Sequence, residues 1–319
     1  MTIATRRAPS GSDRGILVAL PEYPAMKPLE ITDRVAVESY TKTLPMSSDH
    51  NFTSLWMWNI DEETRLARAG ANLVIELQDY ATREPRLTLI GQDDVSGAAM
   101  RVLAHGAQQL DLIPDFVARY LAQSHFVVEH DRDQDDYVAD VDLLATFHGP
   151  TLRKHRQHAN QCARNLGSRL TAVSEIAEPQ TALLELFDRW VVTHNKDVEV
   201  AALERRAVER LAEAWDALGV IAFGLYDDTR LIAAQVHELL PDGAIAHYQK
   251  ADASYRGAFP LLRRLHCQKL ASLDVRQLNL EQDLGIAGLR MSKTRYRPIR
   301  FVRKYCVRLR ADHATPSEA

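Results

Sequence analysis

The chain has 319 residues, of which 46% are hydrophobic and 26% are charged, and its formal net charge is −4. This composition is typical of a soluble globular protein with about two domains. A protein dedicated to duplex nucleic acid would be basic overall, so any contact with nucleic acid must come from a local patch.

Three widely spaced cysteines, Cys162, Cys267 and Cys306, give neither a disulfide framework nor zinc-binding spacing. No apolar run approaches the ~18 residues of a transmembrane helix, and the N-terminus lacks the apolar core of a signal peptide. We therefore expect a cytoplasmic protein without a membrane span. The acidic loop at residues 131–136 lacks the glycine and distal glutamate of an EF-hand, so no metal site is predicted.

After a flexible tail at residues 1–26, residues 27–173 predict a first domain of mixed structure. Its elements alternate between helices at 33–40, 96–105 and 115–122 and strands at 71–77, 86–90, 110–113 and 125–129. An aromatic segment at 51–59 favours core packing.

The first domain ends with a predicted helix, residues 151–166, that has a basic face. At about 100° per residue, one stripe of this helix collects Arg153, Arg156, Asn160 and Arg164. No acidic residue lies between Arg153 and Arg169, and like charges at these spacings repel one another. Either this face is simply solvated, or a polyanion such as a phosphate backbone lies against it.

Residues 174–310 predict a second domain, followed by a flexible tail at 311–319. Two amphipathic helices lead to a hairpin at 220–239, and then come a strand at 244–250, a helix at 259–273 and a strand at 277–281. Two strands joined by such a helix are parallel, and ligands bind at the carboxyl ends of such strands. Lys250 is therefore expected to lie across a cleft from Glu281 and Asp283.

The stretch at residues 278–298 carries the densest chemistry in the chain. An apolar strand leads into the two acids, two glycines follow, and then come the cations Arg290, Lys293, Arg295 and Arg297. A segment that only fills a core would not place acids at a strand end and cations after a glycine-rich turn. The alternative is a structural ion-pair network at the domain interface.

Four phrases resemble the phosphatidylglycerol lysyltransferase C-terminal domain family, a tandem-GNAT group: residues 51–59, 149–160, 247–257 and 279–298. The last phrase is the most specific, because Asn-Leu-Glu-Gln-Asp-Leu-Gly-Ile-Ala-Gly-Leu-Arg is followed by Lys293, Tyr296 and Pro298. The resemblance implies an α/β (α+β) fold of two tandem GNAT-like domains, each a mixed sheet flanked by helices. It places the active site in or beside the second domain. Characterised members of the family transfer an aminoacyl group from aminoacyl-tRNA to an acceptor.

The resemblance also implies tasks for particular residues. Glu281 or Asp283 would act as general base or bind the α-ammonium group, and Lys250 or Lys293 would face the developing oxyanion. Further substrate contacts are expected from His247, Tyr255, Arg256, Arg290 and Tyr296, although His247 on a strand also fits a satisfied core histidine. The phosphates of tRNA would be held by Arg153, Lys154, Arg156, Asn160, Arg164, Arg295 and Arg297.

An acyl-CoA donor would instead need a glycine-rich loop that opens a helix, with the pattern Arg/Gln-x-x-Gly-x-Gly/Ala. The corresponding loop keeps Arg256 and Gly257 but has Phe259 at the next small position. Pro260 then stands where a backbone N–H would serve, and proline has none. The loop therefore disfavours acyl-CoA.

Three functions stay open from the sequence. The first is an aminoacyl-tRNA-dependent transferase that acts on the amine or hydroxyl of a small-molecule or lipid acceptor, with no cofactor besides its donor. The second is an acyl-CoA-dependent N-acyltransferase. The third is a non-catalytic tandem-GNAT binding protein.

Overall fold

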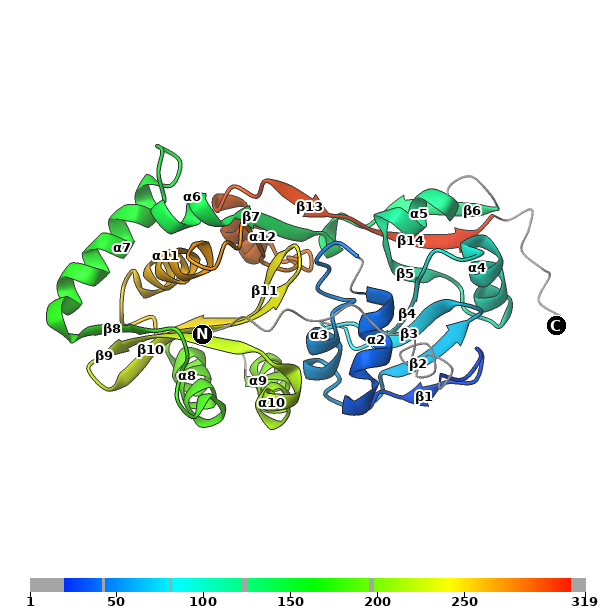
Figure 1. Ribbon diagram of the computed structural model, residues 1–319, viewed down its shortest axis with the longest axis horizontal. Coiled ribbons are helices and arrows are strands. Elements are labelled where there is room, and N and C mark those ends of the chain that lie inside the picture. The colour runs from blue at the N-terminus through cyan, green and yellow to red at the C-terminus, as the bar shows by residue number, and fades with distance from the viewer. Residues whose placement is uncertain (1–19, 42–43, 81, 122–124, 195–197, 311–319) are drawn as a thin grey trace.

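The computed structural model describes residues 20–41, 44–80, 82–121, 125–194 and 198–310, which form two lobes side by side along the long axis (Figure 1). In the first lobe, one antiparallel sheet has the order β1 (Lys27–Pro28), β2 (Arg65–Ala69), β3 (Asn72–Gln78) and β4 (Pro85–Ile90). Beside β4 lies a three-stranded sheet of β5 (Leu110–Pro114), β14 (Lys304–Leu309) and β6 (Phe126–His130).

The second lobe has one seven-stranded sheet. Its order is β8 (Leu170–Val173), β9 (Ile221–Asp227), β10 (Arg230–Leu240), β11 (Gly243–Ala251), β12 (Gln277–Asn279), β7 (Asp136–Asp140) and β13 (Arg300–Val302). The predicted fold class, two tandem GNAT-like units with mixed sheets flanked by helices, is confirmed.

The two lobes exchange one strand. β7 leaves the first lobe and pairs between β12 and β13, whereas β14 returns from the second lobe and pairs between β5 and β6. The strand from the other lobe thus takes the same place in each sheet. The predicted boundary between residues 173 and 174 does not follow this division, because β7 and β8 precede it and yet belong to the second sheet. Alternation of strand and helix cannot show which of two equivalent sheets a strand joins.

The predicted N-terminal tail is also shorter than expected. Leu20 is buried, and the Tyr23 N–H donates to the Arg68 carbonyl at 2.8 Å, so residues 20–26 run along β2. The remaining parts of the predicted tails, residues 1–19 and 311–319, lie outside the described residues.

Helices cover both faces of the second sheet. One face carries α8 (Pro179–Thr193), α9 (Val198–Glu213) and α10 (Trp215–Leu218), and the other carries α6 (Val141–Thr146), α7 (Arg153–Leu166) and α11 (Ala258–Ala271) (Figure 1). α12 (Ala287–Arg295) follows β12. No helix within the described ranges combines the length and the apolar character needed to cross a membrane.

The first lobe contains α2 (Arg34–Thr41), α3 (Phe52–Met57), α4 (Val95–Ala104) and α5 (Asp115–Leu121), with short 3-10 turns at Ile31–Asp33 and Arg132–Gln134. α3 joins the lobes, because Trp56 Nε1 donates to the Arg210 carbonyl of α9 at 3.1 Å. One apolar cluster includes Phe52 from α3, Leu73 from β3 and Leu211 from α9. The lobes therefore share a core, and core packing of the aromatic segment is confirmed for Phe52, Leu55 and Met57.

β11 and β12 are parallel, as predicted, and this pairing positions the site. Only Ala244 with Leu278 and Ile245 with Asn279 form residue pairs between these two strands. β11 continues to Ala251, whereas β12 ends at Asn279. The two carboxyl ends therefore part and leave room between them.

Candidate active site

A cavity of about 820 Å³ lies where β11 and β12 part, a size that suits a small-molecule site. The predicted site residues that line it are His247, Lys250, Tyr255, Arg256, Glu281, Lys293 and Tyr296. The first lobe adds Ser48, Ser54, Trp58 and Tyr80 to the wall. The cavity is thus built by both lobes, although most of its ionisable groups come from the second.

A β-bulge sets the direction of His247. The register between β10 and β11 shifts between Val236 and His237, so His247 is the extra residue in the ladder. Bulges of this kind re-aim a side chain next to active sites. The Nδ1 of His247 lies 3.2 Å from Glu281 Oε1, and its Nε2 lies 3.6 Å from Glu238 Oε2.

These two carboxylates decide the charge of His247. Burial alone would lower the pKa of this imidazole, but the Glu238 carboxylate 3.6 Å away and the hydrogen bond to Glu281 raise it to about 9. His247 is therefore a cation at neutral pH, buried between two carboxylates.

Glu238 supports the pair from behind. Its carboxylate is buried and accepts hydrogen bonds from Thr53 Oγ1 at 2.7 Å and from Asn51 Nδ2 at 3.1 Å, both at the start of α3. Burial raises the pKa of Glu238, but the bonds from His247, Thr53 and Asn51 outweigh it and lower that pKa. Glu238 is not among the predicted site residues, although an acid within the apolar strand predicted at 231–239 was a usable signal.

Glu281 stands on unusual backbone. Its φ is +61°, in the left-handed region that few residues other than glycine adopt, and its N–H donates to Asn279 Oδ1 at 2.7 Å. The side chain is 21% exposed and lines the cavity. Such backbone conformations cluster at functional sites, where surrounding contacts hold them.

Two lysines face the cavity from different walls. Lys293, from α12, donates to the Gln282 carbonyl, and burial lowers its pKa to about 8 although Glu281 opposes that shift. Lys250, from β11, lies 2.6 Å from Glu204 Oε1 and 3.8 Å from the centre of the Trp190 ring. Lys293 thus interacts electrostatically with Glu281, whereas Lys250 contacts Trp190 of α8 and Glu204 of α9.

Asp283 and Arg290, both predicted at the site, do not line the cavity. Asp283 is fully buried and accepts from the Gly285 N–H at 2.9 Å and from Arg290 Nη2 at 2.8 Å. Arg290 also forms an ion pair with Asp133. These contacts fold the turn after Glu281 and keep Asp283 out of the cavity lining. The catalytic role expected for Asp283 stays a prediction.

A fully buried ion cluster lies under the turn and was not predicted. Lys304 Nζ binds Asp136 Oδ1 at 2.7 Å and also contacts Asp49, and all three side chains are inaccessible to solvent. Asn279 Nδ2 donates to Asp136 Oδ2 at 2.9 Å. Because Lys304 is on β14 and Asp136 is on β7, this cluster joins the two exchanged strands.

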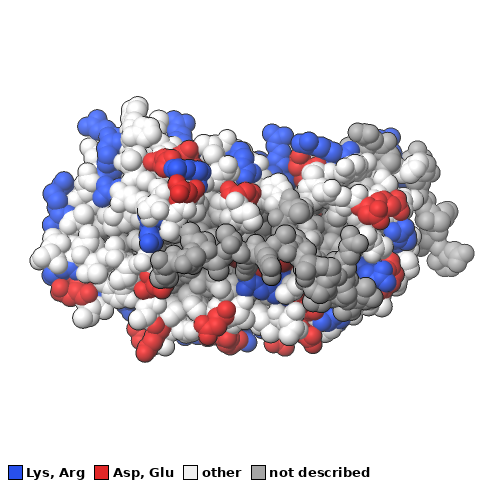
Figure 2. Space-filling model, in the orientation of Figure 1, with Lys and Arg blue, Asp and Glu red and all other residues white. Residues whose placement is uncertain are grey.

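The basic face of α7 is partly engaged in the fold. Arg156 donates to the Phe147 and Gly149 carbonyls, and Asn160 accepts from Arg264 at 2.6 Å. Within the described residues, exposed Arg153 and Lys154 have no acidic partner, and the same holds for Arg164, Arg295 and Arg297. Lys and Arg side chains run along the α7 edge of the molecule, at the left of Figure 2.

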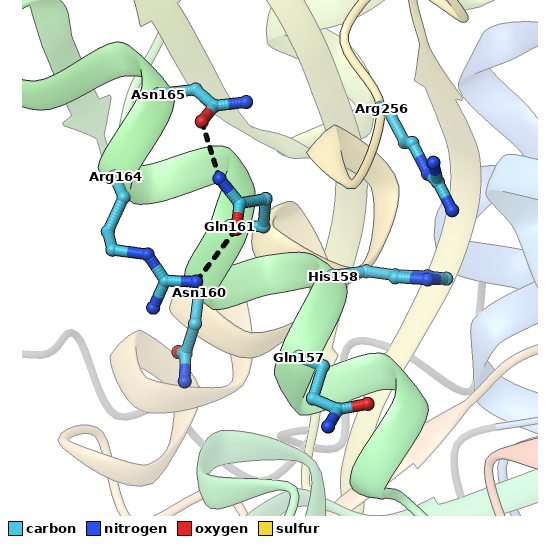
Figure 3. A pocket seen from close by; sticks show the side chains of 7 residues that line it. All are labelled: Gln157, His158, Asn160, Gln161, Arg164, Asn165 and Arg256. Atoms are coloured by element: carbon cyan, nitrogen blue, oxygen red, sulfur yellow. Dashed lines mark hydrogen bonds between the residues drawn. The ribbon is translucent and has the colours of Figure 1, made fainter.

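The start of α7 lies beside the end of α12, because the His155 ring stacks on Tyr296 with ring centres 4.8 Å apart. A second, shallower pocket of about 450 Å³ lies between α7 and the loop before α11. In Figure 3, His158 from α7 and Arg256 from that loop point into the same space. Arg256 lines both pockets, so it stands between the exposed cations and the deep cavity.

The start of α11 is closely covered by α7. Gly257 caps the helix at a φ of +92°, and a Cβ at this position would lie 2.3 Å from the His158 carbonyl oxygen. Pro260, in the first turn, has no N–H.

In the described ranges, no group of three or more His, Cys, Asp or Glu side chains is arranged to hold a metal ion.

Comparison with known proteins places this geometry in a family context. The profile of a family described as phosphatidylglycerol lysyltransferase, C-terminal, matches residues 41–308. A search of curated proteins found no match to the chain. A conserved protein of unknown function from Bacteroides thetaiotaomicron has a TM-score of 0.78 at 22% identity, over 89% of this chain and 99% of that one.

Two further solved structures share the fold. The C-terminal domain of a putative lysylphosphatidylglycerol synthetase from Agrobacterium fabrum has a TM-score of 0.61 at 14% identity, over 89% of this chain and 93% of that one. L-PGS from Bacillus licheniformis has a TM-score of 0.56 at 14% identity, over 82% and 88%. At these identities the likeness shows the fold alone.

Proposed function

The chain belongs to the phosphatidylglycerol lysyltransferase C-terminal family, and from that premise we propose that it transfers an aminoacyl group from aminoacyl-tRNA to an acceptor. The acceptor presents an amine or a hydroxyl and is a small molecule or a lipid. One observation carries the proposal: the chain of Glu238, His247 and Glu281 opens into a cavity that Lys293 also faces.

This arrangement fits acyl transfer from an ester. The acceptor nitrogen or oxygen attacks the ester carbonyl, and the carboxylate of Glu281 takes its proton. Lys293, while protonated, stabilises the developing oxyanion. The carbon–oxygen bond to the ribose then breaks, and the proton passes from Glu281 to the departing ribose oxygen. His247, charged and backed by Glu238, holds Glu281 in place.

The exposed cations support a tRNA donor. Arg153 and Lys154 at the start of α7 lie near Arg295 at the end of α12, and Arg256 leads from this surface into the cavity. Basic groups on the surface suit acceptor-stem phosphates, and the cavity then receives the aminoacyl end. Contacts of this kind weaken as salt rises.

The second candidate, an acyl-CoA-dependent N-acyltransferase, has less support. Its pyrophosphate would need free N–H groups at the start of α11. The His158 carbonyl is packed against Gly257 there, and Pro260 offers no donor. The CoA cradle would therefore require α7 to move away.

A binding assay separates these candidates. Low-salt gel shifts with unfractionated tRNA should give a complex that Arg153→Glu with Lys154→Glu weakens by at least about tenfold. Lys269→Glu is the matched control, because this exposed lysine lies in the last turn of α11 and should leave the shift unchanged. Tight binding of CoA by calorimetry, without any tRNA shift, would refute the tRNA donor.

A transfer assay tests the reaction itself. Pooled tRNA charged with labelled amino acids is incubated with the protein and a cell extract that supplies polar and lipid acceptors. We expect label to leave tRNA for a new product with wild type, and Glu281→Gln to abolish this transfer. If label stays on tRNA although tRNA binds, the non-catalytic alternative is favoured.

A further inference from the structure

The wall of the cavity contains an arginine that the proposed reaction does not use. Arg263, on α11, is 3% exposed, and its side chain lines the cavity. Its Nη2 donates to Gln249 Oε1. Its Nε and Nη1 are buried and have no partner at hydrogen-bond geometry among the described groups, although the guanidinium carbon lies 5.3 Å from the centre of the Tyr296 ring. Buried N–H groups are nearly always paired, so these two need an explanation.

Arg263 also has no counter-ion within the described part of the chain. Its positive charge acts on Lys293 and helps to lower the pKa of that amine. Burial lowers the pKa of Arg263, and the neighbouring Tyr296 and Cys267 only partly offset this. An uncompensated buried charge is strongly destabilising, and an uncharged side chain of similar size would be tolerated better.

Unpaired polar atoms of both kinds lie near Arg263. The acceptor is Oε1 of Gln235, which stands opposite Gln249 in the sheet. Because Gln249 accepts from Arg263 through Oε1, its Nε2 is left as a second unpaired donor facing the same region. Behind it, the rings of His237 and His266 lie 4.5 Å apart. Burial lowers the pKa of His237 to about 4 and holds that of His266 well below its ordinary value, so both are neutral. Among the residues that the structure describes, no imidazolium or carboxylate pairs with the guanidinium.

We infer that Arg263, together with the Gln249 amide and Lys293, forms a subsite for a carboxylate or phosphate group on the acceptor. A guanidinium binds such groups through two parallel N–H bonds. The phosphates of tRNA are served by exposed cations outside the cavity, whereas Arg263 can be reached only from within it. As a statement about the acceptor this inference rests on the proposed function, but the anion site itself does not.

The test uses the full chain without tRNA. Thermal unfolding is followed at constant ionic strength, with sodium phosphate or sodium acetate replacing sodium chloride. We expect phosphate or acetate to raise the Tm of wild type by at least about 2 °C, and the effective anion to show which group fits. Arg153→Ala with Lys154→Ala should keep this response, since those cations are on the outer surface.

Arg263→Met should abolish the anion response, yet its Tm in chloride should equal or exceed that of wild type. The Tm in chloride distinguishes a ligand-binding arginine from a structural one, because loss of a structural arginine would lower it. Arg263→Lys keeps the charge but loses the planar pair of N–H donors. This variant should need at least about ten times more anion to give the same rise in Tm. An anion response that survives in Arg263→Met, or none in wild type, overturns the inference. Failure of aminoacyl transfer alone leaves it intact.

Discussion

The two lobes share one strand order but differ in what their helices bury. α4 follows β4 in the first lobe as α11 follows β11 in the second. The buried residues of α4 are all apolar: Val95, Ala98, Ala99, Val102 and Leu103. Those of α11 include Arg263 and His266, which face polar groups of β10 and β11. The buried face of α4 is thus entirely apolar, whereas the buried face of the corresponding helix α11 contains ionisable groups.

This difference shows a division of labour within one folding unit. The first lobe supplies walls and supports, such as Trp58 and Tyr80 at the cavity and Thr53 on Glu238. Because β7 and β14 are exchanged, neither sheet is complete without the other lobe. The first lobe can therefore be free of catalytic groups and still be required for the site.

The largest difference between the lobes is expected in the transfer rate, when the acidic residue that follows β12 or β5 is replaced. Glu281→Gln removes the proposed base and should lower the transfer rate by about 10²–10⁴-fold. Asp115 follows β5 in the first lobe and contacts Tyr305 at 3.0 Å. Asp115→Asn should leave the rate within about twofold. Equal losses in the two variants would show that both lobes contribute to chemistry.

The next effect concerns the cluster that joins the exchanged strands. Lys304→Met leaves Asp49 and Asp136 buried without their cation, so we expect a loss of about 3–5 kcal/mol in the free energy of unfolding. Arg308 lies on the same strand but forms an exposed pair with Glu129, and Arg308→Met should cost less than about 1 kcal/mol. Urea denaturation measures both. A small loss for Lys304→Met would mean that the buried cluster does not hold the lobes together.

Two buried histidines, one in each lobe, should give the stability of the protein opposite dependences on pH. Burial lowers the pKa of His50 in the first lobe to about 4, whereas the bonds to Glu238 and Glu281 raise that of His247 to about 9 despite its burial. The stability that His247 contributes is complete below its ordinary value of 6.5 and is lost as pH rises through about 9. His50, neutral in the fold, gives stability above 6.5 that is lost as pH falls through about 4.

The loss on the alkaline side should reach at most about 1.4 kcal/mol per pH unit. Lys293 works against it, because a pKa lowered to about 8 makes stability rise between pH 8 and 10.5. The decline should therefore be clearest in Lys293→Met, followed by urea denaturation from pH 6 to 9. Nitrogen chemical shifts of the imidazoles at pH 7.5 give a direct check, since His247 should be charged and His50 neutral. A neutral His247 would contradict the proposed support of Glu281.

The sequence predicted the parallel pair of β11 and β12, because the order strand–helix–strand admits one handedness. From that pair it predicted a cleft with Lys250 opposite Glu281 and Asp283, and of these three residues Lys250 and Glu281 line the cavity. It missed α12, since Gly285 and Gly288 weaken a helical pattern and no side chain caps its start. It missed Glu238, whose partners Asn51 and Thr53 are distant in sequence. The strand exchange and the ion cluster depend on which of two similar sheets a segment joins, and local patterns do not encode that choice.

The smallest expected effect lies at the rim of the cavity. Ile286 and Leu289 line it and are 48% and 40% exposed, so they give the second lobe an apolar edge beside its charged centre. Replacing both by serine should raise the KM for the acceptor by about fivefold, because covering a partly exposed aliphatic side chain contributes on the order of 1 kcal/mol. Val35 in the first lobe is 51% exposed and does not line the cavity, so Val35→Ser should leave KM unchanged. Stability should change little in either variant, since surface substitutions of this kind stay within about 0.5 kcal/mol. A KM that does not move in the rim variant would show that the acceptor enters without covering this edge, which would favour a polar small molecule over a lipid.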